Sequence, residues 1–200
     1  MYDQERAVFR RFKTELERNV VLRSEVESVI EVLLSEYNTT IHENRFVVGG
    51  VLERIIGAAM RAAGIDATNV GKVHPRIDIS VPGTEGFSVK GEFTGTGQIR
   101  LINVLGGGVG GGWREATIFV LTGIGIGYAD PELLPHATVS SGDAVLLKRR
   151  NLTEFLARQP EYLLRCKIAQ KSTNLDRTRM ASEAVAHELL ERFPTLRKFK

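Results

Sequence analysis

The stretch that decides the fold runs from Val73 to Thr94 and has the sequence VHPRIDISVPGTEGFSVKGEFT. Apolar side chains recur at every second position on both sides of residues 82–86, which is the period of a β-strand with one buried face. The residues between them, Pro-Gly-Thr-Glu-Gly, are turn formers and have the length of a hairpin loop. The stretch therefore predicts two short paired strands with two apolar rows buried together: Ile77, Ile79 and Val81 in the first strand, and Phe87, Val89 and Phe93 in the second.

The same hairpin carries polar side chains on its opposite face. Asp78 lies on the first strand, and Ser88, Lys90 and Glu92 alternate along the second. Pairing the strands would gather these side chains on one surface, because residues i and i+2 of a strand share a face. Carboxylates and an amine arranged in this way can hold a divalent cation and a water molecule. A hairpin whose outer face is simply solvated would show the same alternation.

Length and composition indicate one soluble globular domain. The chain has 200 residues, of which 42% are hydrophobic and 26% are charged, as is usual for a domain with its own core. No apolar run reaches the ~18–20 residues that span a bilayer, and the first residues lack the apolar segment of a signal peptide. The single cysteine, Cys166, excludes an intrachain disulfide framework and cysteine-rich zinc sites. We expect a cytoplasmic protein with no membrane partner.

Charge is spread unevenly along the chain. The formal net charge is only +3, but from Lys148 onward the chain has 13 lysines and arginines against 6 acidic residues. A basic C-terminal third is compatible with a polyanionic partner such as nucleic acid. A solvated surface rich in lysine and arginine explains the same composition, so charge alone leaves both interpretations open.

Apolar spacing predicts three helices in the first third of the chain. Two are expected within residues 4–37, the second opened by a capping box at Ser24–Glu27. A third is expected from Asn44, as its N-cap, to about Ala63, with Gly64 as its end.

The rest of the chain alternates between elements. A strand buried on both faces is expected at 116–122, short strands at 144–147 and 162–169, an ambiguous apolar segment at 99–105, and helices at 151–159, opened by a capping box, and 179–192. A glycine-rich run at 106–112 is expected to form a lid, a DNA-facing loop or a plain linker. This order predicts a single α/β domain: a mixed central β-sheet flanked by helices, with a helical arm at 1–40, a core at 44–165 and a basic segment at 166–200.

The third helix carries a charged pair, Glu53 and Arg54, in an otherwise apolar segment. Gly49 and Gly57 lie one turn on either side of Glu53, and each glycine inside a helix costs roughly 1 kcal/mol relative to alanine. Glycines around one carboxylate suggest that something approaches this ridge closely. A surface Glu-Arg pair on a helix that packs through its other side is the alternative.

Glu53 on a helix, Asp78 on one strand and Ser88-Val89-Lys90 on the next strand together resemble the PD-(D/E)xK nuclease superfamily, which includes type II restriction endonucleases and Holliday-junction resolvases. The resemblance covers residues 46–94, and the order of elements is similar to the α-β-β-β-α-β core of that superfamily. It implies a restriction-endonuclease-like fold and a catalytic set of Asp78, Lys90, Ser88 and Glu53. It also implies a Mg²⁺ ion held by Asp78, Glu53 and Glu92.

The chain departs from the superfamily pattern at two positions. Ser88 stands where an aspartate or glutamate is usual, and Pro75 precedes Asp78 by three residues instead of one. Some restriction enzymes of the superfamily carry Ser-x-Lys and take the missing carboxylate from elsewhere. Here Glu53 has the family's helix position, Glu92 has the right strand parity, and Glu115 is the third candidate.

Hydrolysis of a phosphodiester explains why these groups would be needed. The reaction requires a dianionic transition state to be neutralised and a hydroxide to be delivered near neutral pH. Carboxylates hold Mg²⁺, the ion lowers the pKa of its bound water, and Lys90 could orient that water and offset charge in the transition state. Ser88 would act as a hydrogen-bond donor or as a ligand through water.

The resemblance therefore implies a site-specific deoxyribonuclease that binds double-stranded DNA and acts as a homodimer, since palindromic sites are read by two-fold symmetric proteins. A non-catalytic DNA-binding module on the same scaffold, or a structure-specific nuclease of the resolvase kind, is the alternative. Six basic residues are expected to contact DNA: Arg76, Lys72, Arg100, Arg114, Lys167 and Lys171.

Overall fold

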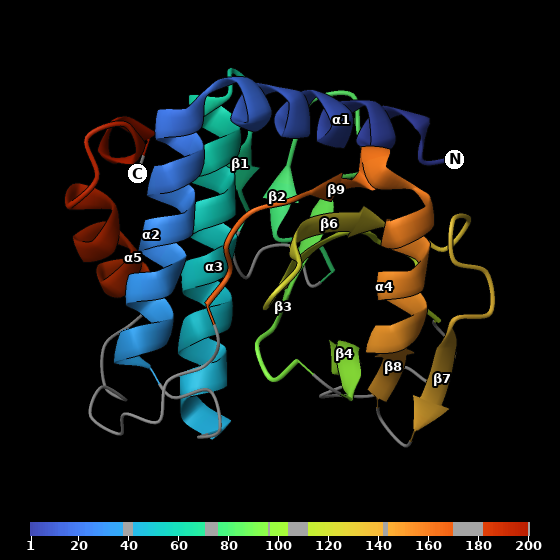
Figure 1. The fold of residues 1–200 in the computed structure, drawn as a ribbon. Helices are drawn as coiled ribbons and strands as arrows, with labels where there is room; N and C mark the ends of the chain where they lie inside the picture. Colours follow the sequence, from blue (N-terminus) through green and yellow to red (C-terminus); the bar gives the residue numbers. More distant parts are fainter. Residues whose placement is uncertain are drawn as a thin grey trace.

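A computed structural model describes residues 1–37, 42–70, 76–95, 97–103, 112–141, 144–169 and 182–199. Its elements form a mixed α/β fold in which five α-helices surround a mixed central sheet within the described ranges (Figure 1). The α/β class predicted from the sequence is confirmed. No helix in these ranges is long and apolar enough to cross a membrane.

The first two helices are α1 (Asp3–Arg18) and α2 (Val20–Glu36). Asn19 separates them, and its side chain accepts a 3.0 Å hydrogen bond from the Leu22 backbone N–H. The two-helix prediction is confirmed, but the predicted capping box is wrong, since Ser24 lies inside α2 and Asn19 is the N-cap. The ring of Phe9 stacks on Tyr128 with centroids 5.4 Å apart, so α1 packs into the common core instead of projecting as an arm.

The third helix, α3 (His42–Ala62), begins two residues before Asn44, so Asn44 is not its N-cap. It ends where predicted, because Gly64 adopts a φ of +75°, a backbone conformation that favours glycine. Its buried stripe includes Val51, Leu52 and Ile55, which are at most 1% exposed. This stripe faces the central sheet and α2.

The central sheet, sheet A, has the strand order β1-β2-β3-β5-β6-β9. The strands are β1 (Thr68–Asn69), β2 (Ile79–Ser80), β3 (Phe87–Glu92), β5 (Ala116–Leu121), β6 (Gly125–Ala129) and β9 (Leu163–Leu164). Strands β3 and β5 are parallel, with Phe87 opposite Ala116, and every other pair is antiparallel. The predicted hairpin is confirmed as β2 and β3, and β5 is buried along its whole length as predicted.

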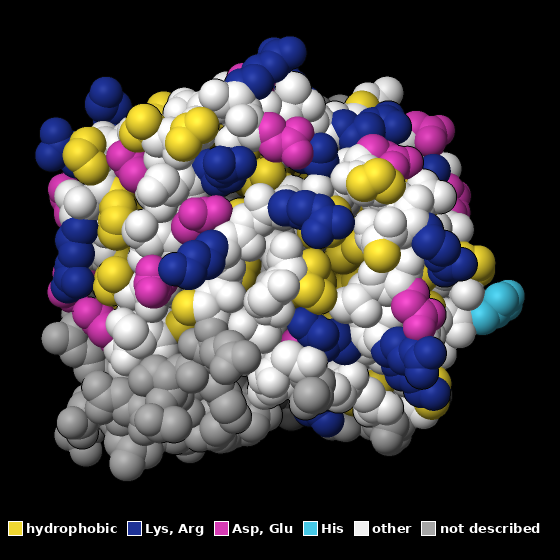
Figure 2. Space-filling model, in the orientation of Figure 1, with side chains coloured by type: hydrophobic (Ala, Val, Ile, Leu, Met, Phe, Trp, Pro, Cys, Tyr) yellow, Lys and Arg dark blue, Asp and Glu magenta, His cyan; other side chains and the backbone are white. Residues whose placement is uncertain are grey.

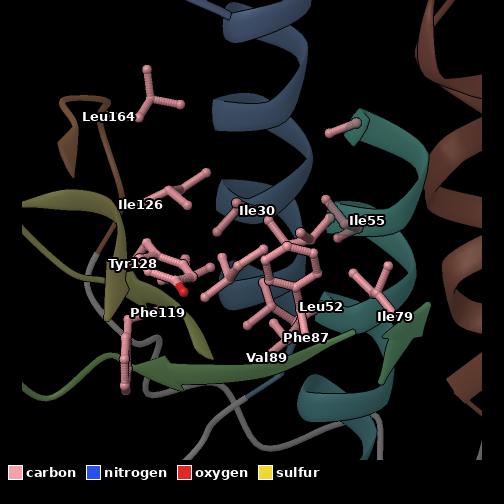
Figure 3. Close-up of a cluster of buried hydrophobic side chains, with 14 of the residues drawn as sticks. Ile30, Leu52, Ile55, Ile79, Phe87, Val89, Phe119, Ile126, Tyr128 and Leu164 are labelled. Atoms are coloured by element: carbon pink, nitrogen blue, oxygen red, sulfur yellow. The ribbon is translucent and has the colours of Figure 1, made fainter. Parts of the chain in front are cut away.

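The core lies between sheet A and the helices α1, α2 and α3. Phe87 and Val89 on β3 meet Leu52 and Ile55 on α3, while Tyr128 enters from β6 (Figure 3). Each buried aromatic or aliphatic side chain here contributes about 2–5 kcal/mol when truncation to alanine leaves a cavity. The apolar row of the hairpin thus fixes β3 against α3, and the alternate row of β3 faces the other way.

A second sheet, sheet B, has the antiparallel order β4-β8-β7. Its strands are β4 (Gln98–Asn103), β8 (Ala144–Lys148) and β7 (Thr138–Ser141), and α4 (Arg149–Arg158) follows β8 directly. The ambiguous segment at 99–105 is a strand, and β1 and β7 were not foreseen because both are short and polar. The predicted capping box at Asn151 is wrong, since α4 begins at Arg149 with Lys148 as its N-cap.

The C-terminal part contains a short 3-10 turn, η2 (Pro160–Tyr162), the helix α5 (Ser182–Glu191) and a final 3-10 turn, η3 (Leu196–Phe199). The strand expected at 162–169 is only two residues long. Both α5 and η3 pack against α3, and the Glu25 carboxylate on α2 accepts hydrogen bonds from the backbone N–H groups of Thr195 and Leu196. Residues 106–111 of the glycine run and residues 170–181 of the basic segment lie outside the described residues.

Candidate active site

Asp78 directly precedes β2 and is held against β3. Its backbone N–H donates a 2.8 Å hydrogen bond to the carbonyl of Phe87. Its side-chain Oδ2 accepts hydrogen bonds from the Val89 backbone N–H at 2.7 Å and from the Ser88 hydroxyl at 3.0 Å. These donors fix the orientation of the carboxylate.

Lys90 lies beside this carboxylate on the same strand as Ser88. Its Nζ is 3.8 Å from Oδ2 of Asp78. The Lys90 and Asp78 side chains are 28% and 21% exposed, so solvent and a ligand can reach both. Asp78, Ser88 and Lys90 therefore lie on one surface, as the alternation along the hairpin predicted.

Glu53 reaches the same place from α3. The pKa of its carboxyl is raised to about 7, mainly by burial and secondly by the charge of Asp78, while Lys90 and Arg54 oppose the shift. Because Asp78 and Lys90 both act on Glu53, the helix-borne carboxylate lies within electrostatic range of the other two groups. Glu53, Asp78 and Lys90 thus converge from three separate elements.

The glycines of α3 have two different surroundings. A methyl group on Gly57 would come within 2.4 Å of Oδ1 of Asn69, whereas a methyl group on Gly49 would meet nothing within 4 Å. The Asn69 side chain on β1 also donates a 2.8 Å hydrogen bond to the carbonyl of Glu53. The close approach expected at this ridge is therefore made at Gly57 by Asn69, which ties β1 to the turn of α3 that carries Glu53.

Glu92 is engaged elsewhere, although it shares the strand parity of Ser88 and Lys90. Its Oε2 accepts a 2.6 Å hydrogen bond from Nε of Arg149, and Oε1 accepts from the backbone N–H groups of Thr94 and Gly95 and from the Thr94 hydroxyl. Glu92 is only 6% exposed. It could ligate a metal only by giving up this ion pair, so Glu53 is the better second carboxylate.

Glu115 stands apart from the set, at the start of β5. Its Oε1 is buried and has no hydrogen-bond partner among the described residues, and Nη1 of Arg76 lies 3.9 Å away. Its Oε2 accepts a 3.2 Å hydrogen bond from the Arg114 backbone N–H. The Glu115 carboxylate therefore lies near Arg76, two residues before Asp78, and forms no hydrogen bond or ion pair with Asp78 itself among the described residues.

The residues expected to contact DNA are scattered over the surface. Arg76, Arg100, Arg114 and Lys167 are exposed, and they lie before β2, on β4, before β5 and after β9, respectively. Lys72 and Lys171 lie outside the described residues.

The donor set suits a hard cation. Within the described ranges, no group of three or more His, Cys, Asp or Glu side chains is placed to hold a metal. Asp78 and Glu53 nevertheless offer two carboxylates, and Mg²⁺ is commonly bound through one or two carboxylates while keeping several waters. Burial is the main cause of the raised pKa of Glu53 and the charge of Asp78 adds to it, so a cation bound beside both carboxylates would favour the ionised form of Glu53.

Sequence reasoning missed the residues that support the site. Arg149 and Asn69 each bridge elements that are far apart in the chain, and neither belongs to a motif. No signal in the sequence pointed to Arg149, because the helix was predicted to begin at Asn151, whereas α4 begins at Arg149.

No protein-family model, curated protein or solved structure matches this chain.

Proposed function

We propose that the protein is a Mg²⁺-dependent endonuclease of the type II restriction enzyme kind, which hydrolyses phosphodiester bonds of double-stranded DNA at a specific site. The observation that carries the proposal is the convergence of Asp78, Lys90 and Glu53. The Lys90 ammonium lies 3.8 Å from the Asp78 carboxylate, and the charges of both groups act on Glu53, which lies 37 positions before Lys90 in the chain. A solvated hairpin face would need neither the helix-borne carboxylate nor the locked orientation of Asp78.

Asp78 and Glu53 would hold the ion. Oδ2 of Asp78 is already taken up by Ser88 and Val89, and Oδ1 accepts no hydrogen bond from the part of the chain that the structure describes. This second oxygen is the one available to a cation. When bound, Mg²⁺ lowers the pKa of a coordinated water and polarises a phosphate oxygen.

Lys90 and Ser88 would have separate roles. The Lys90 ammonium, 3.8 Å from Asp78, offers rotatable N–H donors that can orient a water and stabilise negative charge on the phosphate. Ser88 positions the Asp78 carboxylate through its hydroxyl. In this proposal the serine serves as an orienting donor, and Glu53 replaces the carboxylate that the superfamily usually carries on the strand.

The order of elements also supports the proposal. A helix, a hairpin, a further strand, a helix and a strand follow one another as α3, β2, β3, β5, α4 and β9, with β1, β6 and sheet B as additional elements. This order is compatible with the α-β-β-β-α-β core of the superfamily. We further propose a homodimer and a cytoplasmic location, and sedimentation of the purified chain with and without DNA would test the dimer.

A plasmid nicking assay tests the activity. Supercoiled DNA is incubated with the parent, Asp78→Ala and Lys90→Ala, with Mg²⁺ or with EDTA. We expect nicking only with Mg²⁺, and a loss of at least ~100-fold in each variant, as is usual when a charge-stabilising group is removed. Asp66→Ala is the matched control, because Asp66 is an exposed aspartate in the segment between α3 and β1. Equal nicking by the parent and Asp78→Ala would refute the proposal.

The alternative is a non-catalytic DNA-binding module. Ser88 at the acidic position and the lack of a three-ligand group among the described residues favour it. DNA binding without metal-dependent cutting in the parent would establish this function instead. Preferential cutting of four-way junctions over linear duplexes would indicate a nuclease of the resolvase kind.

A further inference from the structure

Sheet B has an outward face on which side chains align across three strands. Arg100 on β4 pairs with Leu146 on β8, which pairs with Val139 on β7. Gln98 pairs with Lys148 in the adjacent row on the same face. Arg100, Lys148, Gln98 and Val139 are exposed, whereas the neighbouring Ile99, Leu101 and Leu147 are buried toward the interior. We call the surface formed by these two rows the outer face of sheet B.

The charge of this face has one sign. Strands β4, β7 and β8 contain no acidic residue. Arg100 and Lys148 form no ion pair with any residue that the structure describes, whereas Arg150, two positions after Lys148, is paired with Glu154 at 2.6 Å. Figure 2 shows Lys and Arg side chains over the region where Figure 1 shows β8 and α4, together with Asp or Glu side chains, and the acidic residues do not come from β4, β7 or β8. Two uncompensated cations on an acid-free sheet favour a polyanion.

Sheet B is tied to the strand that carries the candidate active site. Strand β4 follows β3 after a short turn in which Gly95 and Gly97 have φ values of +79° and +93°. The turn is fixed by Arg149, whose backbone N–H donates to the carbonyl of Gly97 and whose side chain binds Glu92 at the end of β3. Sheet B is therefore held in a defined position next to the strand that carries Lys90.

We propose that the outer face of sheet B binds the backbone of double-stranded DNA beside the scissile phosphate, with Arg100 and Lys148 each contacting a phosphate. This inference takes the identity of the polyanion from the proposed function. A β-ribbon fits a DNA groove, and strands are an established groove-binding element. The exposed Val139 and half-buried Leu146 add an apolar surface. The sugars and bases of a DNA groove can pack against such a surface, whereas a partner that offers only charges cannot.

The test measures binding separately from cleavage. Fluorescence anisotropy of a labelled mixed-sequence duplex is recorded in EDTA with the Asp78→Ala protein, so the outcome does not depend on whether the protein cuts DNA. Arg100→Ala and Lys148→Ala are added singly and together. Each is expected to weaken binding and to reduce the slope of log affinity against log salt by about 1.

The matched control is the double reversal Arg10→Glu, Arg18→Glu on α1, which lies at the opposite end of the molecule from sheet B (Figure 1). It is compared with Arg100→Glu, Lys148→Glu, which changes the net charge by the same amount. We expect the sheet B reversal to abolish binding and the α1 reversal to leave the salt slope unchanged.

Three results would overturn the inference: no binding of the duplex at low salt, an unchanged slope in both alanine variants, or equal losses in the two reversals. Displacement of the duplex by poly-glutamate at the same charge concentration would also overturn it, because the face would then accept any polyanion. If Asp78→Ala binds through this face while the parent never nicks DNA, the inference stands and the endonuclease proposal falls.

Discussion

Ser88 donates its hydroxyl hydrogen to Oδ2 of Asp78 over 3.0 Å, at the position where the resembling superfamily usually carries an acid. The serine is 5% exposed, so this hydrogen bond forms in a water-poor environment. The contact changes what a substitution at position 88 should do, since an added carboxylate there would face Asp78, whose charge already acts on Glu53.

Ser88→Asp should therefore lower stability in the absence of metal and recover it with Mg²⁺. A third carboxylate beside two others is destabilising, and a cation that binds only the folded state restores stability by mass action. Thermal unfolding in EDTA and over a range of Mg²⁺ concentrations measures both effects. Ser88→Ala is the control: it should cost about 1 kcal/mol for the lost hydrogen bond and show no larger Mg²⁺ response than the parent. A Ser88→Asp protein that ignores Mg²⁺ would contradict a metal site at Asp78.

Glu53 should make stability depend on pH near neutrality. Its pKa is about 7 in the folded protein against 4.5 as the reference, so the folded state binds the proton more tightly than the unfolded state. The stabilisation is complete below about pH 4.5 and is lost as the pH rises through 7, by at most about 3 kcal/mol for this shift. Glu53→Gln should remove this part of the dependence, as urea denaturation across the range would show. A pH profile identical in parent and variant would mean that Glu53 is solvated.

Glu53 should also make metal binding depend on pH, with affinity rising as the pH rises, whereas its contribution to stability falls. A ligand must lose its proton before it binds a cation. Mg²⁺ affinity should accordingly rise between about pH 6 and about pH 8 in the parent and change little in Glu53→Gln. Isothermal titration with Mg²⁺ in buffers of different ionisation enthalpy would also count the released proton. Absence of proton release in the parent would remove Glu53 from the ligand set.

Arg149 and Glu92 should be a strong structural pair. Their side chains are only 17% and 6% exposed, and removing one partner leaves an uncompensated buried charge. Arg149→Ala or Glu92→Ala should cost about 3–5 kcal/mol in the free energy of unfolding, with the double variant losing less than the sum. Arg150 and Glu154 provide the control, since they are joined by the same 2.6 Å contact at side-chain exposures of 86% and 52%. Breaking that solvated pair should leave the unfolding curve unchanged, and equal effects at both pairs would contradict the assignment.

Two glycines on one helix should respond in opposite ways to alanine. Gly49→Ala enters open space and should stabilise the protein by about 0.5–1 kcal/mol through helix propensity. Gly57→Ala should destabilise it, because the new methyl group displaces Asn69 and breaks the hydrogen bond to the carbonyl of Glu53. In an Asn69→Ala background, Gly57→Ala should become stabilising. Denaturant unfolding of the parent, the three single variants and the double variant measures these changes in stability. A stabilising Gly57→Ala in the parent would show that Asn69 moves freely.

The sequence by itself determined the local elements and their faces. The alternation around Pro82–Gly86 predicted the hairpin and the shared surface of Asp78, Ser88 and Lys90, because strand parity is a property of consecutive residues. The spacing of apolar residues predicted α1, α2 and α3, and the β-branched run predicted β5. Helix starts were predicted less well. The N-caps are Asn19 and Lys148, whereas the capping boxes predicted at Ser24 and Asn151 lie inside the helices.

Only the tertiary structure decided which carboxylate joins Asp78. Glu92 and Glu53 were both candidates, and nothing local separates them, because a side chain's partner depends on the elements packed around it. Arg149, 57 positions away, binds Glu92, while α3 packs beside β3 and brings Glu53 to Lys90. The place of β4 in sheet B was equally beyond reach of the sequence, since β4 pairs with β8 across about 45 residues. The short polar β7 was missed for another reason: it pairs with β8 in a local hairpin, and its four residues contain one apolar side chain, too few to show an alternation.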